Sequence, residues 1–313
     1  MTDFSNRDID ATLSRFEAAA TATQLDVPRI EVRRALLALD GSNQDHAVLN
    51  LSRALMNRLG RPVLLTYAYE QPTADPEKDR YLAEQAAALA SGGIETAHAR
   101  DTSGGRAFQQ ILKLAETHAC GLLVLPSPYL EDFQDLGLAS VGTTTDVLLH
   151  QRATPLLIVR KPAESVRDRL ENVVLPLNLV SAQSADAVAW ALKLVPEGGM
   201  IHLLAVVDEE MLDAVRHLLG QSFEAKDVDD ATLAGLGRSD MAGFVATMQS
   251  RAAEANIDCR VSVRQGSFIP TIAEFANAEP CLLIIGCGGD CAARNYQWTL
   301  ALVRQSVNPV LVV

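Results

Sequence analysis

The chain has 313 residues, which is enough for two domains of ordinary size. Its 48% hydrophobic and 21% charged residues are typical of a soluble globular protein. The net charge of −12 weighs against binding to nucleic acid or to an anionic membrane surface, because both need a concentrated basic face. The sequence has no apolar run near the ~20 residues that cross a bilayer and no signal-peptide pattern at its start, so we expect a cytoplasmic protein.

Apolar runs alternate with helical patterns through the first half of the chain. The run Ala35–Leu39 is followed by Asp40 and Gly41, which predicts a buried strand that leads into a loop. Four further strands are predicted in the segments Pro62–Glu70, Ile94–Arg100, Gly121–Pro126 and Thr154–Val159, with helical periods between them. This alternation indicates βαβ units and a parallel sheet covered on both faces.

The second half repeats the first. Four strand segments recur at offsets of 138, 139, 160 and 154 residues: Val173–Asn178, Leu203–Val206, Cys281–Gly286 and Asn308–Val313. About 21 extra residues (160 − 139) are therefore expected in the Glu209–Asn256 region, and about 6 (160 − 154) are missing between the last two strands. An internal duplication predicts two doubly wound α/β units with mostly parallel, five-stranded sheets and pseudo-two-fold symmetry.

The predicted domains are residues 31–162 and 163–313, joined by the polar segment Lys161–Glu171. Residues 1–30 lie outside the repeat. Within them Ile9, Leu13 and Phe16 recur at helical spacing and predict a helical arm, for which packing against the protein is favoured over binding to a partner.

Two segments, "LALDGSNQDHAVLNLSRAL" and "VGTTTDVLLHQRATPLLIVRK", resemble the universal stress protein (UspA-like) family. The pattern occurs twice over about Arg33–Val313, so the chain resembles a tandem member of that family. The resemblance implies a HUP/Rossmann-like fold and a cytoplasmic stress-response role. It also implies that the two fifth strands pair within the chain to form a pseudo-dimer, which leaves a further homodimer open.

The first half keeps part of the family's pattern for binding ATP. The resemblance places Asp40 at the position that faces adenine, Tyr67 at a strand position that contacts the base, and Gly142 and Thr143 at the phosphates. Glycines allow a close backbone approach to phosphates, and N–H groups at a helix start attract them. The family's G-x-x-G is missing, however: "PSPY", residues 126–129, stands there and carries two prolines that have no N–H.

The loop after this segment is acidic. Glu131, Asp132 and Asp135 would lie near the tail of a nucleotide, where one like charge at ~4 Å costs about 4 kcal/mol at an effective dielectric of ~20. A bound Mg²⁺ would reverse that effect, but this interpretation is the weaker one. Without a ligand, Asp40 is interpreted as a turn or helix-cap residue, and "GTTT" as a helix cap.

The second half departs from the pattern in the complementary way. Gly286 and Gly289 satisfy G-x-x-G, but Asn178 replaces the aspartate, and Tyr296 stands where the final glycine is expected. The simpler interpretation of "GCGG" is a flexible turn after a buried strand. Neither half carries a complete site.

Catalysis and metal binding are not favoured. Cys287 and Cys291, with Cys281 nearby, invite a metal or redox interpretation, but the C-x3-C spacing and the absence of a close histidine are unlike a common zinc site. The six histidines are scattered, and no Ser/His/Asp, HExxH or Walker A pattern is present. No metal site and no enzyme are therefore expected, with weak ATP hydrolysis as a remote alternative.

Three hypotheses remain from the sequence. The first, slightly favoured, is a non-catalytic stress-response module that acts through protein partners, with degenerate nucleotide pockets. The second is a regulator that binds an adenine nucleotide, ATP or AMP with Mg²⁺, in the first half. The third is a redox sensor that uses Cys287 and Cys291.

Overall fold

The fold is described from a computed structural model. It describes residues 27–68, 75–101, 103–131, 139–151, 154–160, 167–177, 185–207, 239–286 and 292–313. Most of the expected N-terminal arm, and part of the segment Lys161–Glu171 between the two predicted domains, lie outside these ranges.

The first half alternates strands and helices as the periodicity predicts. Its elements are β1 (Ala35–Leu39), α2 (Asp45–Leu59), β2 (Val63–Tyr67), α3 (Pro76–Ala90), β3 (Thr96–His98), α4 (Ala107–Thr117), β4 (Leu122–Pro126), α6 (Thr143–Gln151) and β5 (Leu156–Val159). Capping residues in the sequence account for where two of the helices end or begin. Gly60 ends α2 in the left-handed conformation, and Asp75 caps α3 by accepting hydrogen bonds from two backbone N–H groups ahead of a proline in the first turn.

The second half continues in the same style. Its elements are α7 (Arg167–Glu171), β6 (Asn172–Leu177), α8 (Ala185–Leu194), β7 (Met200–Val207), α11 (Ser239–Glu254), β8 (Asp258–Gln265), α12 (Phe268–Asn277), β9 (Leu282–Ile285), α13 (Ala292–Gln305) and β10 (Val310–Val312). Helix α11 occupies the end of the region in which extra residues are expected, and residues 208–238 lie outside the described ranges.

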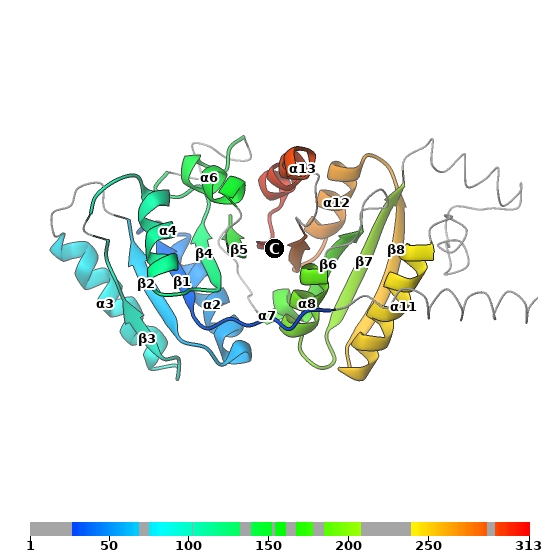
Figure 1. Ribbon diagram of the computed structural model, residues 1–313, viewed down its shortest axis with the longest axis horizontal. Coiled ribbons are helices and arrows are strands. Elements are labelled where there is room, and N and C mark those ends of the chain that lie inside the picture. The colour runs from blue at the N-terminus through cyan, green and yellow to red at the C-terminus, as the bar shows by residue number, and fades with distance from the viewer. Residues whose placement is uncertain are drawn as a thin grey trace, which may run out of the picture.

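All ten strands form one sheet, in the order β3-β2-β1-β4-β5-β10-β9-β6-β7-β8 (Figure 1). Every neighbouring pair is parallel except β5 and β10, which are antiparallel. Read outward from this central pair, each half has the same strand order. The predicted parallel α/β fold is therefore confirmed, and the two expected five-stranded sheets are joined edge to edge into one.

Helices cover both faces of the sheet. One face packs against α2, α3, α7, α8 and α11, and the other against α4, α6, α12 and α13. Successive residues of β1 alternate between the two cores, with Leu37 in one and Leu36 in the other, and both side chains are fully buried. This two-sided burial explains why the strands read as continuous apolar runs. Within the described residues, no helix is long and apolar enough to cross a membrane.

Candidate functional site

The sequence-predicted site of the first half lies where β1, β2 and β4 end. Parallel strands bring their carboxyl ends to one edge of the sheet, which is where open α/β sheets bind ligands. Asp40 directly follows β1, Tyr67 ends β2, and residues 127–131 follow β4. The structure brings these three together at the start of α6, where Gly142 and Thr143 lie.

Asp40 is 7% exposed and both of its carboxylate oxygens are bonded within the protein. Oδ1 accepts the N–H of Ser42 at 2.9 Å, and Oδ2 accepts the N–H of Leu130 at 2.9 Å. The first contact is an Asx turn, so the simple turn interpretation of Asp40 holds, while the helix-cap interpretation does not: the cap of α2 is Gln44. The second contact joins the end of β1 to the loop after β4.

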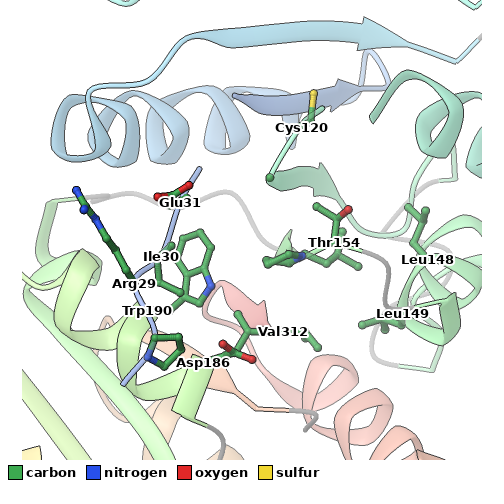
Figure 2. Close-up of a pocket in the computed structure, with 15 residues that line it drawn as sticks. Arg29, Ile30, Glu31, Cys120, Leu148, Leu149, Thr154, Asp186, Trp190 and Val312 are labelled. Atoms are coloured by element: carbon green, nitrogen blue, oxygen red, sulfur yellow. The ribbon is translucent and has the colours of Figure 1, made fainter. Parts of the chain in front are cut away.

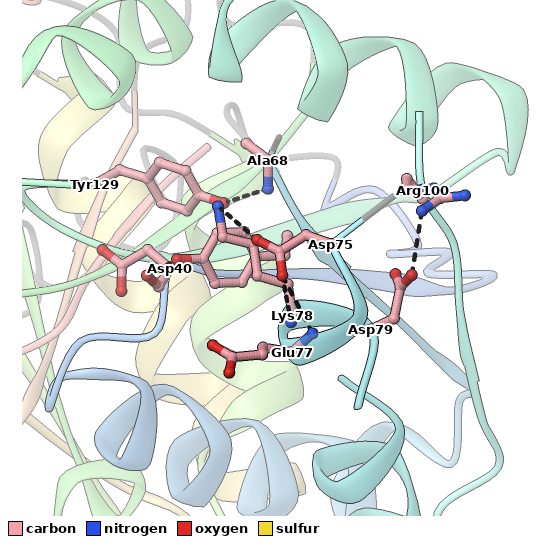
Figure 3. A network of polar contacts seen from close by, with 9 residues as sticks. Asp40, Ala68, Asp75, Glu77, Lys78, Asp79, Arg100 and Tyr129 are labelled. Carbon is pink, nitrogen blue, oxygen red and sulfur yellow. Dashed lines mark hydrogen bonds and ion pairs between the residues drawn. The ribbon is translucent and has the colours of Figure 1, made fainter. Parts of the chain in front are cut away.

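Two tyrosines, Tyr67 and Tyr129, contact the backbone at the end of β1 beside Asp40, and Figure 3 shows Tyr129 there. The hydroxyl of Tyr67 donates to the backbone carbonyl of Asp40, and the Lys78 ammonium lies 4.5 Å from the centre of the Tyr67 ring. The hydroxyl of Tyr129 donates to the carbonyl of Leu39 at 2.8 Å and accepts the N–H of Ala68 at 3.2 Å. Tyr129 is only 1% exposed, and burial raises its pKa well above the ordinary value, so it keeps its proton as a donor.

A second carboxylate, which the sequence analysis missed, lies next to Asp40. Asp45 is 1% exposed and accepts hydrogen bonds from the N–H groups of Asp40 (3.2 Å) and Gly41 (2.8 Å) and from the hydroxyl of Tyr81 (2.7 Å). Burial, and then the charge of Asp40, raise the pKa of Asp45 from 3.8 to about 7. The only sequence signal was an aspartate five residues after Asp40, and nothing near it indicated the contact with α3.

The phosphate-binding positions of the first half are occupied by the protein itself. The N–H of Thr143, at the start of α6, donates to Oε1 of Glu131 at 3.4 Å, and the N–H of Gly142 donates to Oγ of Ser140 at 3.0 Å. In the loop after β4, the N–H of Ser127 donates to the carbonyl of Val159 at 3.0 Å. A carboxylate of the acidic loop therefore stands where a helix N-terminus would otherwise attract a phosphate.

Gly142 is required by its conformation and by a close neighbour. Its φ is +77°, and a Cβ placed there would lie 2.9 Å from the Cβ of Pro128. We expect Gly142→Ala to lower the free energy of unfolding by about 2–4 kcal/mol, from left-handed strain and from the clash. Gly93→Ala is the matched control, because Gly93 has φ +84° but open space around its Cβ position.

Urea unfolding of both variants measures the difference. The control should lose only about 1–2 kcal/mol, which is the conformational cost alone. Equal losses in the two variants would show that Pro128 does not press on Gly142.

The second half has less of a site within the described residues. Gly286 follows β9, while Gly289, Asn178, Cys287 and Cys291 lie outside the described ranges. The expected alignment of Tyr296 with the start of the last helix is wrong, because α13 begins at Ala292 and Tyr296 lies in its second turn. The residues that the second half lacks between its last two strands are therefore missing from the loop before α13, and α13 is longer than its counterpart α6.

Tyr296 instead contacts helix α6 of the first half. Its hydroxyl donates to the Asp146 carboxylate of α6, and its ring meets that of His150 edge-on, with centroids 5.2 Å apart. This side chain therefore connects α13 to α6 across the junction of the two halves.

The described cysteines do not resemble a reactive pair. Burial raises the pKa of the Cys281 thiol to about 12, and this thiol donates a hydrogen bond to the carbonyl of Ala276. The described residues contain no group of three or more His, Cys, Asp or Glu that could hold a metal ion.

A cavity that the sequence did not predict lies between the halves (Figure 2). Its volume is about 460 Å³, and its lining includes Arg29, Cys120, Thr154, Trp190 and Val313. Cys120 and Thr154 precede β4 and β5, so this cavity lies at the opposite end of the first-half strands from Asp40. It forms only where the two halves and residues 28–31 meet, so no local pattern could indicate it.

The strand order and register define a doubly wound, Rossmann-like α/β protein. No family model and no curated protein matches the sequence. Among solved structures, the chain is similar to a universal stress protein from Archaeoglobus fulgidus DSM 4304, with a TM-score of 0.57 and 16% identity over 89% of this chain and 95% of that one.

Two Pseudomonas aeruginosa proteins are similar as well. One, of unknown function, from strain PAO1, gives a TM-score of 0.63 and 13% identity over 90% of this chain and 92% of that one. The other, a proposed universal stress protein from strain UCBPP-PA14, gives a TM-score of 0.64 and 13% identity over 90% of this chain and 93% of that one. At these identities the likeness shows the universal-stress-type fold and nothing finer.

Proposed function

We propose that this chain is a tandem universal stress protein that acts in the cytoplasm as a non-catalytic regulatory or interaction module, with a first pocket that its own side chains keep closed. The identical strand order of the two halves supports the tandem arrangement. Fold neighbours of the universal stress type that span nearly the whole chain support the family assignment. The protein then works through its surface rather than through a bound nucleotide.

One observation supports the proposal that the first pocket is closed. The backbone N–H groups that a nucleotide would bind already have hydrogen-bond partners within the protein. The N–H groups of Leu130 and Thr143 donate to the carboxylates of Asp40 and Glu131. Pro126 and Pro128 have no N–H to offer. A phosphate would have to displace Glu131 and then remain close to that charge, at a cost of about 4 kcal/mol for one like charge at ~4 Å.

Thermal shift with ATP, ADP and AMP, each with and without Mg²⁺, tests the proposal. A ligand at 100 times its Kd would stabilise the protein by about 2.7 kcal/mol, which is several degrees for a chain of this size. We expect no shift at millimolar nucleotide. A saturable shift in the wild type that Asp40→Ala abolishes would contradict the closed pocket.

The second candidate function is an adenine-nucleotide regulator. It is favoured by the positive φ of Gly142 beside the first turn of α6, on the same edge of the sheet as Asp40. Glu131 is exposed, so its side chain is free to swing away from the helix. In this case Glu131→Gln, which removes the charge and keeps the shape, should bind nucleotide more tightly than the wild type does. The closed pocket predicts that neither protein binds.

A further inference from the structure

Strand β8 forms one end of the ten-stranded sheet (Figure 1). It has eight residues, whereas β3 at the other end has three. It pairs with β7 along its whole length, from Met200↔Asp258 to Val207↔Gln265. Within the described part of the chain, no strand pairs with its other edge. A long unpaired edge presents a row of N–H and C=O groups that another strand can bind.

The hydrogen bonds show which residues face outward. The N–H of Asp258 donates to the carbonyl of Gly199, 2.8 Å away, so the backbone of Asp258 points toward β7. Backbone groups alternate in direction along a strand, so the N–H and C=O groups of Cys259, Val261, Val263 and Gln265 point away from the sheet. Any further strand must therefore pair with these outward-facing residues.

The side chains of β8 separate into two faces. Cys259, Val261 and Val263 pack against the core on the face covered by α11. The other face carries Asp258, Arg260 and Arg264, which are exposed, and Ser262, which is half-buried. Edge arginines repel strands that carry positive charge, so a partner has to bring a carboxylate to them.

We propose that β8 pairs antiparallel with β8 of a second copy of this chain, with the two-fold axis at Val261. In this register Cys259 lies opposite Val263 and Val261 opposite its own copy, so the outward backbone groups form about six hydrogen bonds. Asp258 of each copy then lies opposite Arg264 of the other, which makes two cross-strand ion pairs. The two ten-stranded sheets become continuous, with their helical layers aligned.

The charges select this register over the neighbouring one. An axis at Ser262 also matches the outward backbone groups and adds a pair between Cys259 and Gln265, but it places Arg260 opposite Arg264 twice. The axis at Val261 instead places Arg260 opposite the neutral Ser262. The strand is thus self-complementary in hydrogen bonds, apolar face and charge, as a two-fold interface requires.

Charge reversal and its rescue test the pairing by sedimentation equilibrium. We expect a concentration-dependent dimer in the wild type. Asp258→Arg or Arg264→Asp alone should raise the dissociation constant at least tenfold, because each change replaces two attractions with two repulsions. Asp258→Arg combined with Arg264→Asp should restore the dimer. Asp258 is 70% exposed and its ion pair with Arg260 spans 4.0 Å. The exposed Arg264 lies 5.8 Å from the centre of the Phe275 ring. Both contacts are at the surface, so we expect each variant to fold, and urea unfolding of the two single variants checks this.

Cysteine crosslinking fixes the register independently. Val261→Cys should form a disulfide between two copies, because the opposed Cα atoms of a hydrogen-bonded pair lie about 5.5 Å apart, within disulfide range. Ser262→Cys is the matched control, because its copies lie diagonally across the strands at about 7–8 Å. A monomer at all concentrations overturns the proposal. So does a dimer that is insensitive to charge reversal and does not crosslink through Val261→Cys, because it would use another surface.

Discussion

Tyr129→Ala is expected to lower the free energy of unfolding by about 3–5 kcal/mol, the usual cost of deleting a buried aromatic side chain. The ring is 1% exposed and lies beside Asp40, at the position of a glycine in the ATP-binding pattern that the sequence resembles. Its hydroxyl also joins the ends of two strands through Leu39 and Ala68. Urea unfolding with an unchanged m-value measures the loss.

Tyr129→Phe separates the contribution of the hydroxyl to stability from that of the ring, because it removes only the hydroxyl. It leaves the N–H of Ala68 and the carbonyl of Leu39 without the hydroxyl, and we expect a cost of about 1–3 kcal/mol. If Tyr129→Ala were as stable as the wild type, the side chain would not be packed into the core. The account of a filled pocket would then fail.

The second large effect is the pH dependence that Asp45 imposes on stability. Its folded-state pKa of about 7 exceeds the ordinary value of 3.8, so the folded protein holds the proton more tightly than the unfolded chain does. The contribution is therefore fully present below pH ~4 and is lost as the pH rises through about 7. At about 1.4 kcal/mol per pH unit, the loss across this window is on the order of 4 kcal/mol at most.

Asp45→Asn should remove this slope, because the amide does not titrate and still accepts a backbone N–H. Relative to the wild type, the variant should gain stability steadily between pH 4 and pH 7, and urea unfolding at several pH values measures this gain. Glu84→Gln, which changes a carboxylate 64% exposed on α3, is the control and should leave the slope unchanged. A stability difference between Asp45→Asn and the wild type that does not change with pH would show that Asp45 is ionised throughout.

The fold could be predicted from the sequence because its signals are local. The strands are short apolar runs buried on both faces, and the recurrence of four runs at similar offsets indicated the second half. The pairing of β5 with β10, where the two halves meet, could be predicted only from the family resemblance. The runs "PLLIV" and "PVLVV" indicate that both strands are buried, but they do not indicate that the two strands pair. The antiparallel register Val310↔Ile158 is a contact between residues far apart in the sequence.

The candidate site was predicted only in part, because its contacts span long stretches of chain. Asp40 was identified, but its bond to Leu130 crosses 90 positions, and the contact between Asp45 and Tyr81 crosses 36. The acidic residue Glu131 was expected near the phosphates. That it would bond to the N–H of Thr143 depends on how the loop folds back onto α6, and no local pattern encodes this.

A crystal structure of the protein grown with millimolar ATP and Mg²⁺ tests the central claim most directly. We expect the carboxylate of Glu131 beside the N–H of Thr143, the Asp40 carboxylate bonded to Leu130, and no nucleotide at this edge of the sheet. A phosphate at the start of α6, with Glu131 turned away and adenine beside Asp40, would contradict the closed pocket and make the protein a nucleotide-dependent regulator.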